Sequence, residues 1–204
     1  TLKVKKGDLI FFGAGKEKIV NDYMSRLIAR IGEDLNLLEN DFMACWITDF
    51  PMFEEASDGS LTSLHHPFTS PVQTNLEKLS ELNPLEINSK AYDMVINGVE
   101  IGGGSIRIHK KDLQKKVFEL LGLSEEEAQT KFGFFLKTLN TGCPPHGGIA
   151  FGLDRLAMLM VGADSIRDVI AFPKTQSALC LLTEAPGPVT DESLDELHIS
   201  RKED

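Results

Sequence analysis

Cysteine is scarce in this chain of 204 residues, which contains only Cys45, Cys143 and Cys180. An odd number of widely spaced cysteines excludes a fully paired disulfide framework, and the sequence lacks the close cysteine pairs of a structural zinc site. The thiols are therefore expected to be reduced, which favours a cytoplasmic location.

Long apolar runs and basic charge are scarce as well. No stretch reaches the roughly 18 apolar residues of a membrane-spanning helix, so no membrane partner is expected. The net charge of −10 argues against a freestanding nucleic-acid-binding surface, because Lys and Arg contacts to phosphate supply most non-specific affinity. The chain does have a hydrophobic content of 42%, which is enough to bury a core.

The most informative stretch runs from Gly147 to Arg155 and reads Gly-Gly-Ile-Ala-Phe-Gly-Leu-Asp-Arg. Its first five residues are small and apolar, as in a buried strand, and helical periodicity follows over residues 153–161 before Gly162. A strand is therefore predicted to give way to a helix near Gly152. The free amides of a helix start and the guanidinium of Arg155 suit a phosphate group. A glycine-rich packing junction with a surface arginine is the alternative.

A β-hairpin is predicted around the Asn-Gly pair at residues 97–98, which separates two β-prone runs as a type I′ turn does. With Val95 opposite Glu100, Asp93 would face Gly102, and the two carboxylates would project from the same face. Two converging carboxylates suit Mg²⁺, which proteins hold with one or two carboxylates plus substrate phosphates. A solvated strand face is the alternative.

Arg107 lies seven residues after Glu100, so strict alternation would place the two side chains on opposite faces of the sheet. The three glycines at residues 102–104 are where a β-bulge could insert one extra residue. Such a bulge would turn Ser105, Arg107 and His109 toward the face of Glu100. We therefore predict a bulge or bend in this strand.

The remaining periodicity predicts an α+β fold, in which an antiparallel sheet is flanked by helices. Helices are expected over residues 16–31, 110–121 and 124–139, and further strands over 46–53, 64–68 and 147–151. The apolar stripe of the first helix is expected to be core, and residues 191–204 are expected to be a frayed terminus.

Taken together, these motifs resemble the class II aminoacyl-tRNA synthetases, and within them the bacterial-type aspartyl-tRNA synthetases. The Gly147–Arg155 run is similar to the third class II signature, and residues 100–107 are similar to the aspartate-specific segment before it. Further similar runs are Trp46-Ile-Thr-Asp-Phe-Pro-Met-Phe-Glu54, Leu64-His-His-Pro-Phe-Thr-Ser-Pro71, Pro144-Pro-His-Gly147 and Ile166-Arg-Asp-Val-Ile-Ala-Phe-Pro-Lys174.

The resemblance implies an aspartate site in which Arg107 pairs with the substrate side-chain carboxylate, a contact that a bidentate guanidinium makes well. It implies His66 as a second aspartate contact and places Ser105 with them. Because adjacent side chains of an extended segment point in opposite directions, only one of His65 and His66 is expected to enter the pocket.

The resemblance also implies that ATP is held by Glu100, Gly152, Leu153, Asp154 and Arg155, and that Asp93 and Glu100 hold Mg²⁺. No residue is assigned as a general acid or base, because adenylate formation relies mainly on positioning and charge neutralisation. His109 and His146 flank the site in sequence, where packing or backbone hydrogen bonding is the expected role.

The implied reaction is activation of L-aspartate with ATP to aspartyl-adenylate, followed by transfer to tRNA. Residues 1–40 are expected to be the closing segment of a bacterial-type insertion domain, and residues 41–204 the C-terminal half of the catalytic domain. The first two class II signatures are absent, so this piece alone is expected to be inactive. The full-length protein is expected to be a homodimer, with its tRNA contacts mainly upstream.

Two other functions remain open from the sequence. One is a related ligase for asparagine or lysine, which is disfavoured because Arg107 with His66 suits an acidic side chain. The other is a non-catalytic amino-acid-binding or interaction module that has kept the pocket and lost the chemistry. Whether the full enzyme also charges asparagine tRNA depends on contacts outside this chain.

Overall fold

The computed structural model describes residues 3–39 and 42–202. The chain divides into two compact units, residues 1–42 and residues 43–204. The predicted domain boundary between residues 40 and 41 lies outside the described residues, as do the last two residues of the predicted frayed terminus.

The first unit contains helix α1 (Glu17–Asp34), close to the predicted range of 16–31. The helix continues past Gly32 and ends before Leu35, whose N–H donates to the carbonyl of Ile31. Its apolar stripe was expected to be core, and this was wrong: no residue of α1 is buried, and Ile19 and Ile28 are 60% and 69% exposed.

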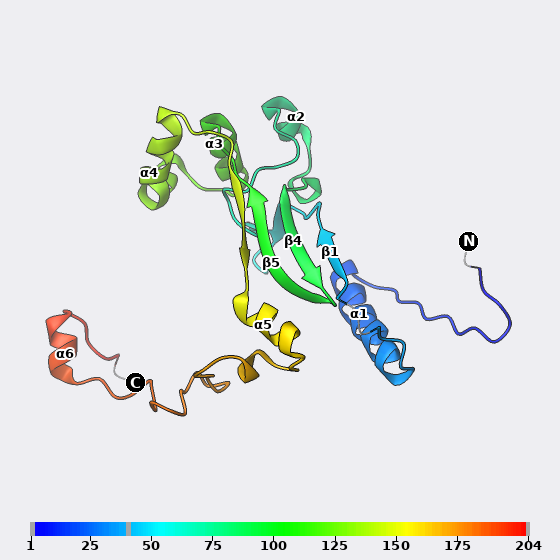
Figure 1. Ribbon diagram of the computed structural model, residues 1–204. Coiled ribbons are helices and arrows are strands. Elements are labelled where there is room, and N and C mark those ends of the chain that lie inside the picture. The colour runs from blue at the N-terminus through cyan, green and yellow to red at the C-terminus, as the bar shows by residue number, and fades with distance from the viewer. Residues whose placement is uncertain (1–2, 40–41, 203–204) are drawn as a thin grey trace. The chain divides into compact units, whose positions relative to one another are not determined.

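The second unit is built on a four-stranded antiparallel sheet, as Figure 1 shows, which confirms the predicted α+β fold. The strand order is β1-β4-β5-β6, in which β1 is Ala44–Ile47, β4 is Ala91–Ile96, β5 is Val99–Ile106 and β6 is Gly147–Phe151. A separate two-stranded sheet pairs β2 (Phe53–Glu55) with β3 (Leu61–Ser63). None of the helices in the described ranges has the length and apolar character needed to cross a membrane.

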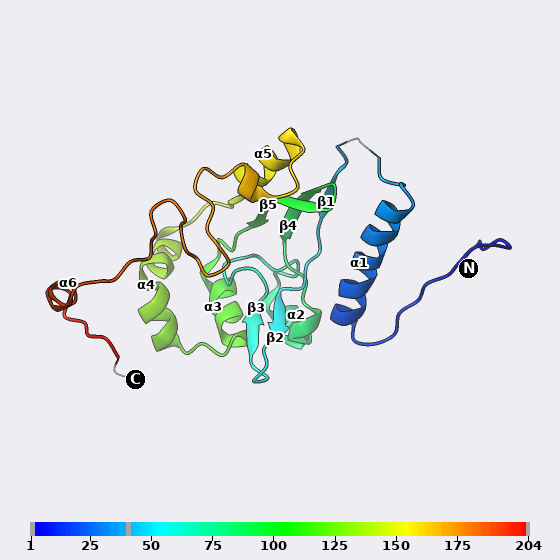
Figure 2. The same cartoon turned by 90° about the horizontal axis from the view of Figure 1, so that it is seen from below.

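Four helices of the second unit lie at the two ends of the main sheet. Helices α2 (Leu76–Glu81), α3 (Lys111–Leu120) and α4 (Glu125–Thr141) lie near the end of β5, whereas α5 (Leu153–Val161) lies near its beginning (Figure 1). Viewed from below, β2 and β3 are on one side of the main sheet and α5 is on the other (Figure 2). The chain also forms α6 (Asp191–Glu196) and two short 3-10 helices, Pro84–Glu86 and Ile166–Asp168.

Local signals placed α3 and α4 correctly. Gly122, with φ +73°, follows α3, and α4 begins with the expected capping box, in which the Ser124 hydroxyl accepts from the Glu127 N–H while the Glu127 carboxylate accepts from the Ser124 N–H. The core lies between β2, α2 and α3, and consists of Met52, Phe53, Leu79, Ile87, Ile108, Leu113 and Val117. Because Ile108 is 1% exposed, the core anchors the chain just after β5.

Three predicted segments differ from the structure. The strand expected over residues 46–53 is interrupted after Ile47, because Asp49 adopts a left-handed conformation with φ +60°. Residues 64–68 form a bend at residues 64–65 and a turn at residues 67–68 rather than a strand, and a single β-bridge joins Thr69 to Arg107. Part of the expected frayed terminus is α6, whose first turn is capped by the Thr190 hydroxyl, which accepts from the Ser193 N–H.

Candidate functional site

The hairpin between β4 and β5 turns at residues 97–98 as predicted, with φ +49° at Asn97 and +79° at Gly98. Both positive values are what a type I′ turn requires. Val95 faces Glu100, also as predicted, but Asp93 faces Gly103 rather than Gly102.

The difference arises because the register of β4 and β5 shifts between Met94 and Val95, and Ile101 has no direct partner on β4. The predicted bulge is therefore present, but it lies just before the glycines instead of within them. Ile101 is 2% exposed, and burial of its side chain accounts for the position of the extra residue.

The bulge brings Asp93, Glu100 and Ser105 to one face of the sheet, since directly paired residues of antiparallel strands point the same way. Arg107 follows Ser105 by two residues and shares this face. A cavity of about 380 Å³ lies over it. The residues that line the cavity are Leu64, His65, His66, Thr69, Asp93, Glu100, Gly103, Gly104, Ser105 and Arg107.

Two predictions about histidines are corrected by this cavity. Both His65 and His66 line it, because residues 64–68 bend and the alternation expected of an extended segment does not apply. His109 was expected on the face of Glu100, but it borders another cavity together with Cys143. His146 acts through its backbone, whose carbonyl oxygen accepts from the Arg107 N–H at 2.9 Å.

Arg107 lines the cavity and has an unmet hydrogen-bonding need. Its Nη1 atom is buried and has no hydrogen-bond partner among the described residues. A buried donor of this kind is unfavourable until an acceptor reaches it, and a guanidinium pairs best with a planar carboxylate. The cavity therefore presents a binding position for a carboxylate.

His66 lies beside this position as a neutral donor. Its Nδ1 accepts the Phe68 N–H at 3.2 Å, so the proton of the neutral ring sits on Nε2. Partial burial lowers the pKa of His66, and the positive charge of Arg107 lowers this pKa further. Thr69 lies on the floor, with its hydroxyl donating to Ser105 Oγ at 3.3 Å.

Asp93 and Glu100 form the acidic part of the cavity. Burial raises the pKa of Asp93 and the negative charge of Glu100 raises it further, whereas the charge of His65 acts in the opposite direction. Gly103 lies between the two carboxylates: a Cβ there would sit 2.6 Å from Asp93 Oδ1 and 3.7 Å from Glu100 Oε1. The absence of a side chain at this position therefore keeps the two groups accessible.

These two carboxylates fit a Mg²⁺ ion that completes its shell with ligand phosphates and water. Burial and the charge of Glu100 both disfavour the ionised form of Asp93, and a bound cation would offset this cost. Within residues 3–39 and 42–202, no three His, Cys, Asp or Glu side chains gather as a metal site, so a cation here would need oxygens from a ligand.

The strand-to-helix junction lies where it was predicted, but the strand is not buried as expected: all five residues of β6 are exposed. β6 ends at Phe151, α5 runs over Leu153–Val161, and Gly162 follows with φ +67°. No side chain caps the start of α5, so its first amides remain available to an anion. Arg155 lies in the first turn, where its Nη1 donates to the Glu100 carbonyl oxygen at 2.7 Å.

The residues predicted to bind ATP are therefore split between two neighbouring places. Glu100 lines the cavity, whereas Gly152, Leu153, Asp154 and Arg155 are not among its lining residues. The Gly152 N–H donates to the Ile101 carbonyl oxygen at 2.7 Å, which attaches the helix start to β5. The sequence did not identify Thr69 as a site residue, and it excluded one of the two histidines. The signal that could have identified all three is their position in the Leu64–Pro71 run.

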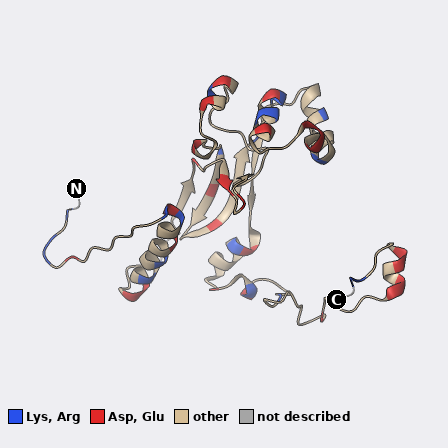
Figure 3. Cartoon of the chain, turned by 180° about the vertical axis from the view of Figure 1, so that it is seen from behind, with Lys and Arg blue, Asp and Glu red and all other residues tan. Residues whose placement is uncertain are grey.

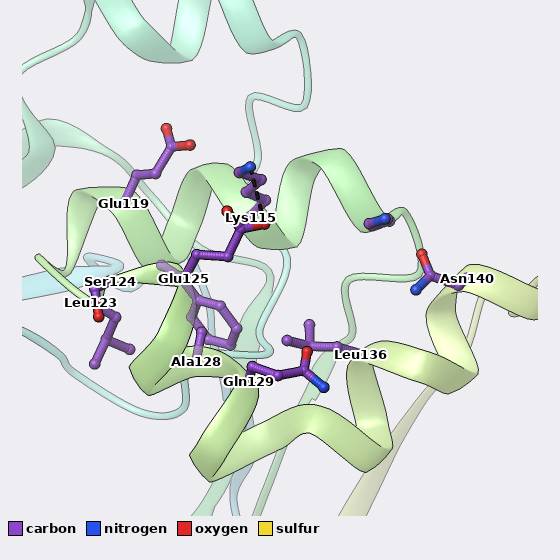
Figure 4. Close-up of a pocket in the computed structure, with 11 residues that line it drawn as sticks. Lys115, Glu119, Leu123, Ser124, Glu125, Ala128, Gln129, Leu136 and Asn140 are labelled. Carbon is purple, nitrogen blue, oxygen red and sulfur yellow. Dashed lines mark hydrogen bonds and ion pairs between the residues drawn. The ribbon is translucent and has the colours of Figure 1, made fainter.

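A second cavity, of about 460 Å³, lies between α3 and α4 (Figure 4). Its walls combine apolar side chains with charged ones, and Lys115 Nζ lies 3.4 Å from Glu125 Oε1 across it. That lysine and glutamate satisfy each other, in contrast to the unpaired Nη1 of Arg107. The cavity over the sheet is therefore the better candidate for binding a charged ligand.

Comparison with known proteins shows a family match over most of the chain. The family described as tRNA synthetases class II (D, K and N) matches residues 16–176. An aspartyl-tRNA synthetase from Entamoeba histolytica is 24% identical over 74% of this chain and 26% of that chain, with a TM-score of 0.50. This likeness supports the fold, an antiparallel sheet with flanking helices.

Asparaginyl-tRNA synthetases are similar at the same level. The enzyme from Entamoeba histolytica, solved in complex with asparaginyl-adenylate, is 22% identical over 69% of this chain and 26% of that chain, with a TM-score of 0.46. The enzyme from Pyrococcus horikoshii, complexed with asparaginyl-adenylate, is 21% identical over 67% of this chain and 26% of that chain, with a TM-score of 0.46. The chain thus spans 26% of the length of each of these three structures.

Proposed function

Because this chain belongs to the class II tRNA synthetases of the D, K and N group, we propose that it is part of a ligase that activates L-aspartate with ATP. The observation that carries the choice of aspartate is the buried, unpartnered Nη1 of Arg107. A side-chain carboxylate would accept from this guanidinium, and the neutral His66 ring would donate from Nε2. Ser105, 5% exposed on the same floor, completes the aspartate site.

Asparagine is the second candidate, because solved relatives include asparaginyl-tRNA synthetases. An amide offers one acceptor oxygen, and its NH₂ group would face the donors of Arg107. Sites that hydrogen-bond a polar group reject an analogue that cannot make the same bonds. The chemistry of Arg107 therefore favours aspartate over asparagine.

The ATP end of the site is assigned to Glu100 and to the start of α5. Uncapped amides and the guanidinium of Arg155 favour phosphate oxygens, so we assign Gly152, Leu153, Asp154 and Arg155 to ATP. Arg155 is anchored to β5 through the Glu100 carbonyl oxygen. Along β5, Glu100 and Ser105 are five residues apart, roughly 16 Å at about 3.3 Å per residue, a span suited to an elongated ligand.

Asp93 and Glu100 are assigned to Mg²⁺, which would neutralise phosphate charge when bound. The residues of the chain orient the two substrates. An oxygen of the aspartate α-carboxylate attacks the α-phosphorus of ATP, a P–O bond forms, and the bond to the leaving pyrophosphate breaks. The attacking carboxylate is already ionised at neutral pH, so no general base is required. Positioning and charge stabilisation carry the step.

Transfer of the aspartyl group to tRNA is proposed for the longer protein, acting as a homodimer in the cytoplasm. Basic residues are interspersed with acidic ones on the helices, and the four charged residues of α6 are all acidic (Figure 3). This distribution, with the net charge of −10, supports tRNA contacts that lie mainly outside this chain.

We also propose that residues 1–40 close an insertion domain and that residues 41–204 belong to the catalytic domain.

The test is amino-acid-dependent ATP–pyrophosphate exchange by the complete polypeptide, with aspartate, asparagine and lysine supplied separately. Exchange with aspartate alone is expected. Exchange with asparagine or lysine would overturn the specificity. Aspartate binding without any exchange would favour a non-catalytic binding module, and the isolated 204-residue chain, run in parallel, is expected to be inactive.

A further inference from the structure

Gln114 is a polar residue at a core position of α3. It is 0% exposed and lies on the buried face of the helix with Leu113, Val117 and Phe118. Such a face normally carries apolar side chains, because a buried amide is unfavourable unless its polar atoms are hydrogen-bonded. A polar residue that breaks the core pattern often marks a functional position.

The amide of Gln114 holds the segment that carries His66. Its Nε2 donates to the carbonyl oxygen of Pro67 at 2.9 Å, whereas its Oε1 is buried without a partner in the described chain. The single hydrogen bond is therefore the one polar contact that compensates for burying the side chain. It fixes the peptide group between Pro67 and Phe68, which also contains the Phe68 N–H.

The same segment is held from the other side by an aromatic cluster. The ring of Phe68 packs against Phe118 of α3 and against Phe132 and Phe135 of α4, with centroid distances of 5.9, 5.2 and 4.4 Å. These contacts fix the position of Phe68. They do not set the rotation of the preceding peptide group, which the hydrogen bond from Gln114 does set.

His66 depends on that rotation. Its Nδ1 accepts the Phe68 N–H, so the ring follows the backbone between residues 66 and 68. The ring also lies close enough to Arg107 for the charge of Arg107 to contribute to its lowered pKa. A rotation of the Pro67 peptide would therefore move His66 Nε2 relative to the guanidinium.

We propose that Gln114 is a positioning residue that orients His66 toward Arg107 and thereby sets the affinity of the cavity for its amino acid. The inference rests on the proposed function. Gln114 holds the segment that brings His66 to the Arg107 end of the cavity, whereas the assigned ATP residues lie at the Glu100 end. Loss of the hydrogen bond is therefore expected to raise the KM for the amino acid and to leave the KM for ATP unchanged.

Gln114→Met tests this in pyrophosphate exchange by the complete polypeptide, because methionine keeps the side-chain volume and removes the donor. The KM for aspartate is expected to rise about two- to twelvefold, the range that corresponds to one net hydrogen bond. Leu113→Met is the matched control, a volume-conserving change in the same core. It is expected to leave both KM values unchanged.

Gln114→Glu provides a readout that a purely structural role would not give. A buried carboxyl has a raised pKa, and its protonated form can donate to the Pro67 carbonyl oxygen as the amide does. Its KM for aspartate, relative to that of the wild type, is expected to be lower at pH 6 than at pH 8. The same ratio for Gln114→Met is expected to stay flat. If Gln114→Met does not fold, the pH dependence of the Gln114→Glu ratio alone decides.

An unchanged KM for aspartate in Gln114→Met, or an equal rise in both KM values, would overturn the inference. So would the absence of any pH dependence in the Gln114→Glu ratio. These results leave the proposed function intact as long as the wild type catalyses aspartate-dependent exchange. If the wild type catalyses no exchange, the proposed function fails, and the inference fails with it.

Discussion

Arg155 in the first turn of α5 donates from Nη1 to the main-chain carbonyl oxygen of Glu100 at 2.7 Å, and the same atom lies 3.7 Å from Glu100 Oε2. The contact joins the two stretches that the sequence singled out, the glycine-rich run after residue 147 and the hairpin strand. It places the start of α5 beside the acidic end of the cavity.

Arg107→Gln is expected to reduce kcat/KM for aspartate in pyrophosphate exchange by at least about 30-fold. Removing one partner of a buried charge pair typically costs about 2 kcal/mol or more. The effect on the KM for ATP should be small, because Arg155 and Glu100 remain. Arg26→Gln is the matched control, since the side chain of Arg26 is 78% exposed in the first unit. An equal loss in both variants would contradict the role of Arg107.

Gly103→Ala is expected to raise the Mg²⁺ concentration needed for half-maximal exchange. The added Cβ would lie 2.6 Å from Asp93 Oδ1, so the carboxylate must move. We expect a shift of about tenfold, in line with changes next to metal ligands. Gly187→Ala serves as the control, because a Cβ at Gly187 would meet nothing within 4 Å. An unchanged Mg²⁺ dependence would show that Asp93 is not a ligand.

Asp93→Asn is expected to stabilise the Mg²⁺-free protein at pH 7 while abolishing exchange. The pKa of Asp93 is raised in the folded state, so folding favours the protonated form, and stability falls as the pH rises through the raised pKa. Asparagine does not ionise, so the variant does not lose stability in this way. After allowance for solvent screening, a rise of about 1–2 °C in Tm is expected from thermal unfolding, corresponding to roughly 0.5 kcal/mol.

The two proteins should converge in stability as the pH falls below the raised pKa, because Asp93 is then protonated in the wild type. A Tm of Asp93→Asn below that of the wild type at pH 7 without Mg²⁺ would contradict the charge repulsion between Asp93 and Glu100.

His66→Gln is expected to be less sensitive to acid than the wild type. The pKa of His66 is lowered below 6.5 in the folded state, so its contribution to stability is present above pH 6.5 and is lost as the pH falls from 6.5 through the lowered pKa. After allowance for solvent screening of this exposed side chain, the free energy of unfolding of the wild type relative to that of the variant should therefore fall by up to about 0.5 kcal/mol between pH 7.5 and pH 5.5.

Urea denaturation at the two pH values measures this shift. His109→Gln, at a histidine outside the cavity, is the control. If the difference in the free energy of unfolding between wild type and His66→Gln does not change with pH, the His66 ring is not held neutral.

Local signals explain which parts of the fold could be predicted. The Asn-Gly turn at residues 97–98, the capping box at Ser124 and the glycine after α5 each act through neighbouring residues, and each element lies where it was expected. The need for an extra residue between Glu100 and Arg107 also followed from alternation alone. Its position at Ile101 did not, because burial of Ile101 depends on the tertiary fold.

The segment around His65 and His66 shows why the rest was missed. Its bends depend on contacts from far along the chain, the hydrogen bond from Gln114 to Pro67 and the bridge between Thr69 and Arg107. A local pattern contains neither contact, so an extended strand was predicted and one histidine was excluded. The exposed stripe of α1 has a similar cause, since an amphipathic pattern does not tell which surface covers it.

The most direct test of the proposed site is a crystal structure of the complete polypeptide with a non-hydrolysable aspartyl-adenylate analogue. We expect the side-chain carboxylate within about 3 Å of the Arg107 guanidinium and of His66 Nε2, with the phosphate near the start of α5 and Arg155. An analogue bound with its side chain away from Arg107, or in the cavity between α3 and α4, would contradict the assignment.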